Sequence, residues 1–190
     1  DRVDTILIGG AVAHTFLRAL GKDIGRSEID EGTIYSAKKL ISSSMSRSIR
    51  LVIPEDFVGV RGDLNNKPSS YIISGGRIPN DSMAVDLGPE TSKQFAKHIS
   101  RARTVLWNGP LGMCERAGFG EGTAALAKAL AESDAWSAVV GESTLEALEV
   151  VGARLEVVAR RVGVVARAVV VAVGIVGGED QRSRRLVEDD

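Results

Sequence analysis

Residues 104–115 read Thr-Val-Leu-Trp-Asn-Gly-Pro-Leu-Gly-Met-Cys-Glu, and no other stretch says as much about the fold. The apolar run 104–107 predicts a buried strand. This strand stops at Asn108 and opens into a loop that contains two glycines and one proline. Ligands of α/β folds bind at such strand-end loops, because the backbone can approach a ligand there. An Ala-rich run at 124–132 predicts that a helix follows the loop.

Short strands and helices alternate along the rest of the chain. Apolar runs predict strands at 5–8, 50–53 and 137–140, and a short edge strand at 71–73. Periodic apolar residues predict helices at 11–20, in a run that begins at Ser27, and at 90–99. This alternation is typical of βαβ units around a mainly parallel sheet. We therefore predict an α/β fold with a doubly wound, mainly parallel sheet and helices on both faces, a Rossmann-like three-layer sandwich.

The composition restricts the class of protein. The 190 residues fit one domain, with or without a tail. A formal net charge of -1 gives no electrostatic reason to expect a nucleic-acid partner. The single cysteine, Cys114, argues against an internal disulfide and a Cys-cluster zinc site, so we expect a cytoplasmic protein. Residues 1–4 show no signal-peptide pattern, and the longest uncharged apolar run, 168–176, is too short to span a membrane.

The composition changes after about Gly152. Lysine disappears, valine dominates residues 150–176, and the aromatic residues are absent from that stretch. We therefore expect a nucleotide-binding domain over 1–150 and a divergent, partly disordered, Arg/Val-rich tail over 151–190. The β-propensity of this tail makes it an aggregation risk if it cannot pair with a strand.

Residues 107–115 resemble the Trp-Asn-Gly-Pro-x-Gly-x-x-Glu signature of phosphoglycerate kinase. Three further blocks resemble that family in the same order: residues 4–17, Ile53-Pro54 followed by Asp56, and residues 83–90. The likeness covers residues 3 to about 149 and corresponds to the family's C-terminal, nucleotide-binding domain. The segment with the Gly-rich Ser-Thr-Gly-Gly-Gly-Ala run that the family has further on is missing here.

The resemblance implies reversible phosphoryl transfer between 1,3-bisphosphoglycerate and MgADP, which gives 3-phosphoglycerate and MgATP in glycolysis. The implied cofactors are ATP or ADP with Mg²⁺. The family's basic patch for phosphoglycerate belongs to an N-terminal half that this sequence does not match. We therefore expect a fragment that supplies the nucleotide half of the site and meets phosphoglycerate only if an N-terminal half is supplied.

The resemblance also implies a set of nucleotide-binding residues. On the residues alone, Gly9 and Gly10 either close a tight strand-to-helix turn or let the backbone approach a flat ring or a phosphate. The resemblance favours an adenine-pocket wall, in which Ala84 and Val85 stand where the family usually has Gly-Leu. Glu115 matches the acidic residue that takes the ribose hydroxyls. The full set that we assign to the nucleotide is Gly9, Gly10, Gly25, Ala84, Val85, Pro110, Gly112, Met113, Glu115, Gly141, Ser143 and Thr144.

Two residues are expected to act on the transferred phosphate. Arg18 stands where the family has a phosphate-binding Lys, and Asn108 matches the Asn beside the transferred group. Arg keeps the positive charge, but it is longer and flatter than Lys, so the replacement is not conservative. The alternatives are a surface Arg and an Asn that caps its own loop.

The turn at 140–144, Val-Gly-Glu-Ser-Thr, departs most from the family pattern of Gly-Gly-Gly-Asp-[Ser/Thr]. An ungapped match puts Ser143 in the place of the magnesium-holding Asp, and a one-residue slip puts Glu142 there. We therefore expect Glu142 or Ser143 as the metal ligand, since Mg²⁺ prefers oxygen ligands. An acidic helix N-terminus is the alternative interpretation of Glu142.

Two other functions remain open from the sequence. One is a catalytically inactive, degenerate nucleotide-binding or interaction module, which the altered turn and the tail favour. The other is a different α/β enzyme, which the consecutive family-like blocks argue against. We assign His14, His98 and Cys114 to packing or surface roles, because no motif gives any of them a catalytic partner.

Overall fold

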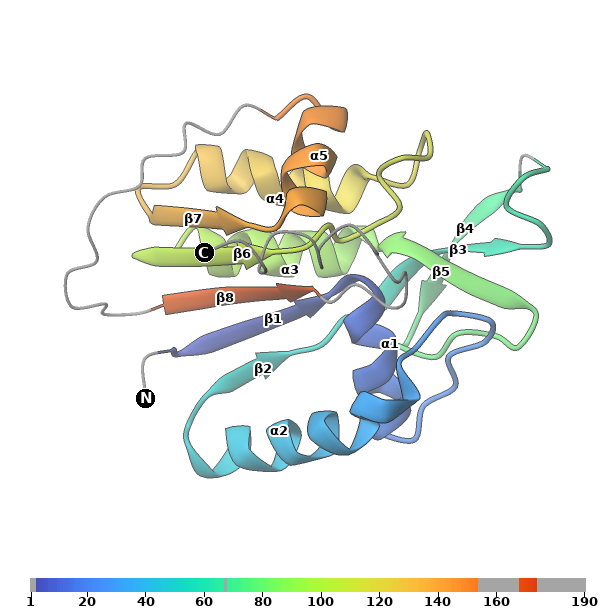
Figure 1. Ribbon diagram of the computed structural model, residues 1–190, viewed down its shortest axis with the longest axis horizontal. Helices are drawn as coiled ribbons and strands as arrows, with labels where there is room; N and C mark the ends of the chain where they lie inside the picture. Colours follow the sequence, from blue (N-terminus) through green and yellow to red (C-terminus); the bar gives the residue numbers. More distant parts are fainter. Residues whose placement is uncertain (1–2, 67, 154–167, 174–190) are drawn as a thin grey trace, which may run out of the picture.

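The computed structural model describes residues 3–66, 68–153 and 168–173, and a five-stranded parallel sheet forms its centre (Figure 1). The strand order is β2-β1-β8-β6-β7. The strands are β1 (Thr5–Gly9), β2 (Arg50–Val52), β6 (Thr104–Asn108), β7 (Trp136–Val140) and β8 (Ala168–Val173). Each adjacent pair in this order runs parallel.

Helices cover both faces of this sheet (Figure 1). Neighbouring residues of β1 show the two faces, because Leu7 packs in one apolar core while Ile6 and Ile8 pack in the other. The predicted doubly wound α/β sandwich is therefore confirmed. The helices are α1 (Gly10–Ala19), α2 (Ile34–Ser46), α3 (Pro89–Ile99), α4 (Glu121–Ala131) and α5 (Glu142–Val150).

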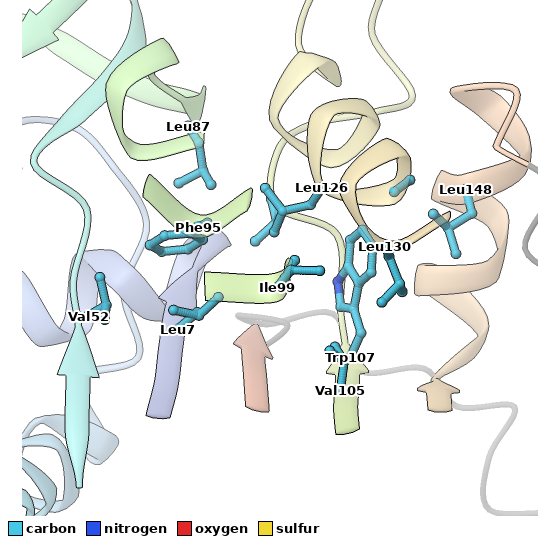
Figure 2. Packing of buried hydrophobic residues seen from close by; sticks show 12 residues of the cluster. Leu7, Val52, Leu87, Phe95, Ile99, Val105, Trp107, Leu126, Leu130 and Leu148 are labelled. Carbon is cyan, nitrogen blue, oxygen red and sulfur yellow. The ribbon is translucent and has the colours of Figure 1, made fainter. Parts of the chain in front are cut away.

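The larger core lies between the sheet and helices α3, α4 and α5 (Figure 2). Phe95 of α3, Leu126 of α4 and Leu148 of α5 meet Leu7 and Trp107 from the sheet. Trp107 has no exposed surface at all. Burying a side chain of that size contributes on the order of 2–3 kcal/mol, so the strand that leads into the 108–115 loop is firmly fixed.

The second core lies under α1 and α2. Phe16 and Leu17 of α1 and Ala37 of α2 are buried there together with Ile8 of β1. The helix at 11–20 was predicted with Val12, Phe16 and Leu20 on its buried face; Phe16 is buried and Val12 packs against this core, but Leu20 is 46% exposed and Leu17 is buried instead. The core fixes the start of α1 directly behind the end of β1.

A small antiparallel sheet, which the sequence analysis largely missed, packs beside the main one (Figure 1). It consists of β3 (Asp56–Arg61), β4 (Ser70–Ser74) and β5 (Ser82–Leu87) in the order β4-β3-β5. Only β4 was expected, as an edge strand. Gly59 in β3 and Asp86 in β5 are poor strand formers, so pairing rather than local propensity makes these strands.

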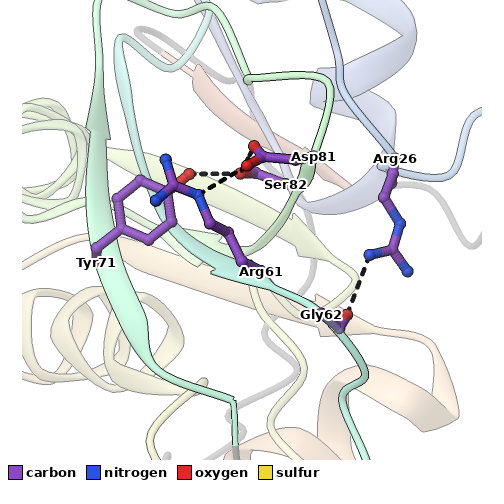
Figure 3. Close-up of polar contacts among 6 residues, drawn as sticks. All are labelled: Arg26, Arg61, Gly62, Tyr71, Asp81 and Ser82. Carbon is purple, nitrogen blue, oxygen red and sulfur yellow. Dashed lines mark hydrogen bonds and ion pairs between the residues drawn. The ribbon is translucent and has the colours of Figure 1, made fainter.

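Polar contacts tie the outer end of the small sheet together (Figure 3). Arg61 forms an ion pair with Asp81 at 3.1 Å and lies 4.8 Å from the centre of the Tyr71 ring. Ser82 donates a hydrogen bond to Asp81 at 2.8 Å. The ion pair is largely exposed, so it contributes little stability by itself.

The second helix begins later than the sequence predicted. α2 starts at Ile34 after a short 3₁₀ turn at Glu31–Thr33, so the expected start at Ser27 is wrong. Ser27 is buried, and its Oγ accepts a hydrogen bond of 3.0 Å from the amide of Ala84. A tertiary contact to β5 thus uses the hydroxyl that was taken for a helix cap.

Part of the expected tail forms the middle strand of the main sheet. β8 lies between β1 and β6, with Val171 opposite both Leu7 and Trp107. Because both edges of β8 are paired, it has no open edge for aggregation along its length. The expected disorder of residues 154–167 and 174–190 lies outside the described residues, and the division into 1–150 and 151–190 stays a prediction.

Candidate functional site

A pocket of about 320 Å³ opens beside the carboxyl ends of β1 and β6. Parallel α/β sheets bind their ligands at this edge, because strand-end loops and helix N-termini converge there. Backbone and side chains from α1, the small sheet, the 108–115 loop and α5 form its wall. The lining residues are Gly10, Ala11, His14, Glu28, Phe57, Met83, Ala84, Val85, Asp86, Leu87, Pro110, Leu111, Gly112, Met113, Glu115 and Ser143.

Side chains hold the first half of the 108–115 loop in place. The indole of Trp107 donates to the carbonyl of Gly109 at 2.7 Å. The amide of Gly109 donates in turn to the hydroxyl of Thr144 at 2.6 Å. Thr144 is fully buried and donates to the carbonyl of Val140 at 2.7 Å. The loop is thereby linked to β7 and α5.

The second half of the loop is anchored on α4 and β5. The hydroxyl of Thr123 accepts from the amide of Leu111 at 3.0 Å and lies 3.2 Å from the Cys114 sulfur. The amide of Met113 donates to the carbonyl of Val85 at 2.9 Å, which continues the edge of β5. Burial raises the pKa of the Cys114 thiol. Cys114 therefore packs the loop, as expected.

A buried carboxylate of β5 is hydrogen-bonded to α4 and packs against the 108–115 loop. Asp86 is 3% exposed and accepts hydrogen bonds from the amides of Leu87 at 2.8 Å and Gly122 at 3.0 Å. Burial raises the pKa of Asp86 to about 6. The hydrogen bonds from these amides act in the opposite direction and lower this pKa, but their effect is smaller. A Cβ on Gly112 would overlap the Asp86 carboxyl, so the loop passes this group as closely as glycine allows.

A histidine that the sequence analysis assigned to packing or the surface lies on the pocket wall. His14 is buried, its Nδ1 lies 3.2 Å from the carbonyl oxygen of Glu28, and its ring is 5.9 Å from that of Phe57. Desolvation lowers the pKa of His14 to about 4, against the raising effect of the Glu28 carbonyl. His14 stands four residues after Gly10, and this one-turn spacing from a glycine turn is the signal that could have found it.

The predicted nucleotide residues are divided between the pocket wall and its surroundings. Those that line the pocket are Gly10, Ala84, Val85, Pro110, Gly112, Met113, Glu115 and Ser143. Those outside its lining are Gly9, Arg18, Gly25, Asn108, Gly141, Glu142 and Thr144. The pocket lining also contains residues that were not predicted: Phe57, Met83, Asp86 and Leu87 from the small sheet, and Ala11, Glu28 and Leu111.

Gly25 has a structural reason of its own to be glycine. Its φ is +54°, and a Cβ there would overlap the carbonyls of Pro79 and Ser82. The neighbouring Ile24 pairs with Ile78 in an isolated bridge. Gly25 therefore packs the chain against the start of β5, behind the pocket.

The turn before α5 brings Asn108 to a helix N-terminus. Gly141 has a φ of 92°, and a Cβ there would lie 3.1 Å from Oδ1 of Asn108. Within the described part of the chain, the amides of Glu142 and Ser143 donate to no other residue. Two open amides at the positive end of a helix dipole attract an anion. An amide side chain and two backbone donors thus converge beside the pocket.

Oxygen ligands at this turn fit a magnesium ion carried by phosphates. No group of three or more His, Cys, Asp or Glu residues that could hold a metal occurs among the described residues. Glu142 is exposed in the first turn of α5, and the hydroxyl-bearing Ser143 follows it on the pocket wall. Mg²⁺ is commonly held by one or two carboxylates together with substrate phosphates, and the carboxylate of Glu142 is compatible with that mode of binding.

Arg18 is one of the predicted residues outside the pocket lining. It is exposed in the last turn of α1, four residues after His14, and therefore on the same side of the helix. Its long side chain has no hydrogen bond or ion pair with the described residues.

No helix within the described residues is long and apolar enough to cross a membrane.

Comparisons with known proteins agree on one family. The model of the family "Phosphoglycerate kinase" matches residues 1–159. The phosphoglycerate kinase of Desulfosudis oleivorans is 38% identical over 152 residues, which are 80% of this chain and 38% of that protein. The phosphoglycerate kinase of Clostridium novyi is 38% identical over 153 residues, with the same coverage. The chain therefore spans about two fifths of the length of these relatives.

Solved structures show the same likeness. Phosphoglycerate kinase from Coxiella burnetii matches 79% of this chain with a TM-score of 0.75 and 33% identity, over 38% of its own length. The enzyme from Pyrococcus horikoshii matches 90% of the chain with a TM-score of 0.57 at 23% identity, over 40% of its length, and supports the fold alone. With matching sequence blocks, fold and strand-end pocket, this chain belongs to the phosphoglycerate kinase family.

Proposed function

We propose that this chain binds an adenine nucleotide and supplies the nucleotide half of a phosphoglycerate kinase site. The pocket at the ends of β1 and β6 carries the proposal, because it unites residues from three of the family-like blocks. Ala84, Val85 and Met113 give it apolar walls, and glycine backbone at Gly10 and Gly112 lets a flat base approach. The base would lie against the small sheet.

The ribose and the phosphates would extend toward α5. Glu115 lies on the pocket wall, where a carboxylate can accept hydrogen bonds from two ribose hydroxyls. The open amides of Glu142 and Ser143 would receive phosphate oxygens. The exposed carboxylate of Glu142 would hold the Mg²⁺ that accompanies the nucleotide, which neutralises phosphate charge.

Asn108 and Arg18 would act on the transferred phosphoryl group. Asn108 stands at the mouth of the α5 turn and can donate from its amide without adding charge. Arg18 can bring a positive, forked donor from α1. Phosphoryl transfer demands alignment and charge stabilisation more than covalent help from the protein, and these two residues can provide both.

The phosphoglycerate side of the reaction requires residues beyond this match. The chain spans 38% of the first relatives, and the family resemblance places the basic patch for phosphoglycerate in an N-terminal half that this sequence does not match. We therefore expect the 190-residue chain alone to show no appreciable turnover. A coupled assay for ATP formation from 1,3-bisphosphoglycerate and MgADP tests this, and robust formation that depends on the chain would contradict it.

Calorimetric titration of the purified chain with MgADP, repeated with magnesium chelated, tests the binding proposal. We expect saturable binding that weakens when the metal is removed. Binding that is indifferent to metal would support the adenosine pocket and reject the role of Glu142. A folded sample that binds no nucleotide would reject the proposal.

A second candidate, an inactive nucleotide-binding module, is favoured by one observation. Val140 and Glu142 stand beside Gly141 where the family pattern has glycines, and both side chains are exposed at the α5 turn. A carboxylate there repels phosphate whenever no cation lies between them. Supplying a separate N-terminal half of a relative in the coupled assay distinguishes the two, because an inactive module would bind MgADP without any gain of turnover.

A further inference from the structure

The two nitrogens of the His14 imidazole differ in their hydrogen bonding, because only Nδ1 has a partner among the described residues. The partner of Nδ1 is the carbonyl oxygen of Glu28 at 3.2 Å, and a carbonyl can only accept. Nδ1 must therefore carry the hydrogen. In the neutral ring this leaves Nε2 with a lone pair, which makes it an acceptor.

Nε2 of His14 has no hydrogen-bond partner among residues 3–66, 68–153 and 168–173. The only contact among the described residues that involves a ring nitrogen of His14 is the one to Glu28. The fully buried side-chain nitrogens and oxygens without a partner, among the same residues, comprise only Nε1 of Trp136. His14 is 8% exposed and lines the pocket, and within the described part of the chain its Nε2 is neither hydrogen-bonded nor among the fully buried atoms without a partner.

The ring has little freedom to change this arrangement. Phe57 lies against it at a centroid distance of 5.9 Å, and α1 carries it between the buried neighbours Ala13 and Thr15. Burial lowers the pKa of His14 to about 4, so the ring stays neutral at pH 7. Turning Nε2 into a donor would require the ring to give up its hydrogen bond to Glu28 or to take a proton in a desolvated place.

From this geometry we infer that His14 is a specificity-determining residue that selects adenine over 6-oxopurines through Nε2. The 6-amino group of adenine can donate to this acceptor. The 6-carbonyl oxygen of hypoxanthine or guanine would instead place a second acceptor opposite Nε2, and both would lose their hydrogen bonds. The inference rests on the proposed nucleotide site and adds to it the residue that distinguishes adenine from 6-oxopurines.

The inference is tested by calorimetric titration of the 190-residue chain with MgADP and, separately, with MgIDP. These ligands differ in the group at position 6 of the purine. For the unaltered chain we expect MgIDP to bind roughly tenfold more weakly than MgADP, as expected for one lost hydrogen bond in a buried site. In His14→Phe, which keeps a ring against Phe57, the ratio of the two dissociation constants should fall close to one.

A matched control and a second variant separate selectivity from folding. His98→Phe makes the same change on α3, outside the pocket lining, and should keep the ratio of the unaltered chain. His14→Gln offers both a donor and an acceptor, so it should bind both ligands with a ratio near one. If neither His14 variant folds, nitrogen chemical shifts of His14 in the unaltered chain give the answer, since the Nε2 signal should respond to MgADP and not to MgIDP.

The outcomes for the base and for the site are distinct. A folded chain that binds neither nucleotide rejects the proposed function and the inference together. A chain that binds MgADP, with the same ratio in its His14 variants as in the unaltered protein, or with an Nε2 signal that MgADP leaves unchanged, overturns the inference alone.

Discussion

The 108–115 loop and the 140–144 turn lie side by side at one end of the sheet. They differ in how many of their backbone groups already form hydrogen bonds within the protein. Trp107, Thr123 and Thr144 anchor the loop through their side chains. At the turn, the amides of Glu142 and Ser143 donate to no residue that the structure describes. The loop thus provides a fixed wall, whereas the turn keeps free donors for an anion. A binding site needs both, because rigidity positions a ligand and open donors attract it.

The largest effect is expected where the loop passes Asp86. In Gly112→Ala the new Cβ would overlap the Asp86 carboxyl and the Phe119 carbonyl, so the backbone of the loop must move. We expect the free energy of unfolding to fall by about 3 kcal/mol, at the upper end for an overpacked site. Denaturant titration at constant m-value measures this loss.

Gly118→Ala is the matched control in the same loop. Gly118 has a φ of 86° but no atom near its Cβ direction, so only backbone strain opposes alanine. We expect a loss of about 1–2 kcal/mol. Equal losses in the two variants would show that the close approach to Asp86 does not constrain the loop.

Next in size is the link between the two regions. Thr144→Val removes the acceptor for the amide of Gly109 while it keeps a β-branched side chain. A buried donor left without a partner costs about 1–3 kcal/mol, and we expect that loss of unfolding free energy together with weaker MgADP binding. Thr33→Val, at an exposed hydroxyl, serves as the control. Loss of stability with unchanged MgADP affinity would show that the turn does not depend on the loop.

Asp86 and His14 should give the pocket wall two opposing dependences on pH. The folded-state pKa of Asp86 is raised to about 6, so its stabilising contribution is present below its unfolded pKa of 3.8 and is lost as the pH rises through 6. The folded-state pKa of His14 is lowered to about 4, so its contribution is present above 6.5 and is lost as the pH falls through 4. The two slopes oppose each other between pH 4 and 6.

Single variants should reveal each slope. As the pH falls from 6 to 4, the free energy of unfolding of Asp86→Asn should decrease more steeply than that of the unaltered chain. Over the same range, the free energy of unfolding of His14→Phe should decrease less steeply than that of the unaltered chain. Each difference should reach about 2–3 kcal/mol across the window, because one pKa unit corresponds to 1.36 kcal/mol. Unfolding free energies at pH 4.5 and 7 provide the measurement. Parallel pH curves for all three proteins would contradict both assignments.

The smallest effect is expected at the turn itself. Glu142 is exposed, so Glu142→Gln should leave the stability within about 0.5 kcal/mol of the unaltered chain. The change should instead reduce the gain in ADP affinity that magnesium provides, by about threefold, as for one screened charge contact. Titrations with and without chelator measure this gain, and Glu146→Gln in the same helix is the control. An unchanged gain would exclude Glu142 as a metal ligand.

Local sequence predicted β1, β2, β6 and β7 of the main sheet but not β8, for a physical reason. The strands at 5–8, 104–107 and 137–140 are compact apolar runs, and the helix at 11–20 has one apolar face, so neighbours along the chain reveal them. In the small sheet only β4 was predicted, because Gly59 and Asp86 interrupt the apolar pattern of β3 and β5. The prediction of a helix start at Ser27 was wrong. The hydroxyl of Ser27 accepts a hydrogen bond from the amide of Ala84, and the residues next to Ser27 in the sequence give no sign of this tertiary contact.

The sequence by itself determined the family, the parallel α/β sandwich and the glycine-rich segments that line the pocket, since motif spacing and hydrophobic period are local properties. Only the tertiary structure placed β8 between β1 and β6, buried Asp86 against the loop, and brought His14 to the pocket wall with one nitrogen available. These features arise from contacts between distant parts of the chain. Pairing, burial and desolvation at such contacts depend on the whole fold, and no short stretch of sequence encodes them.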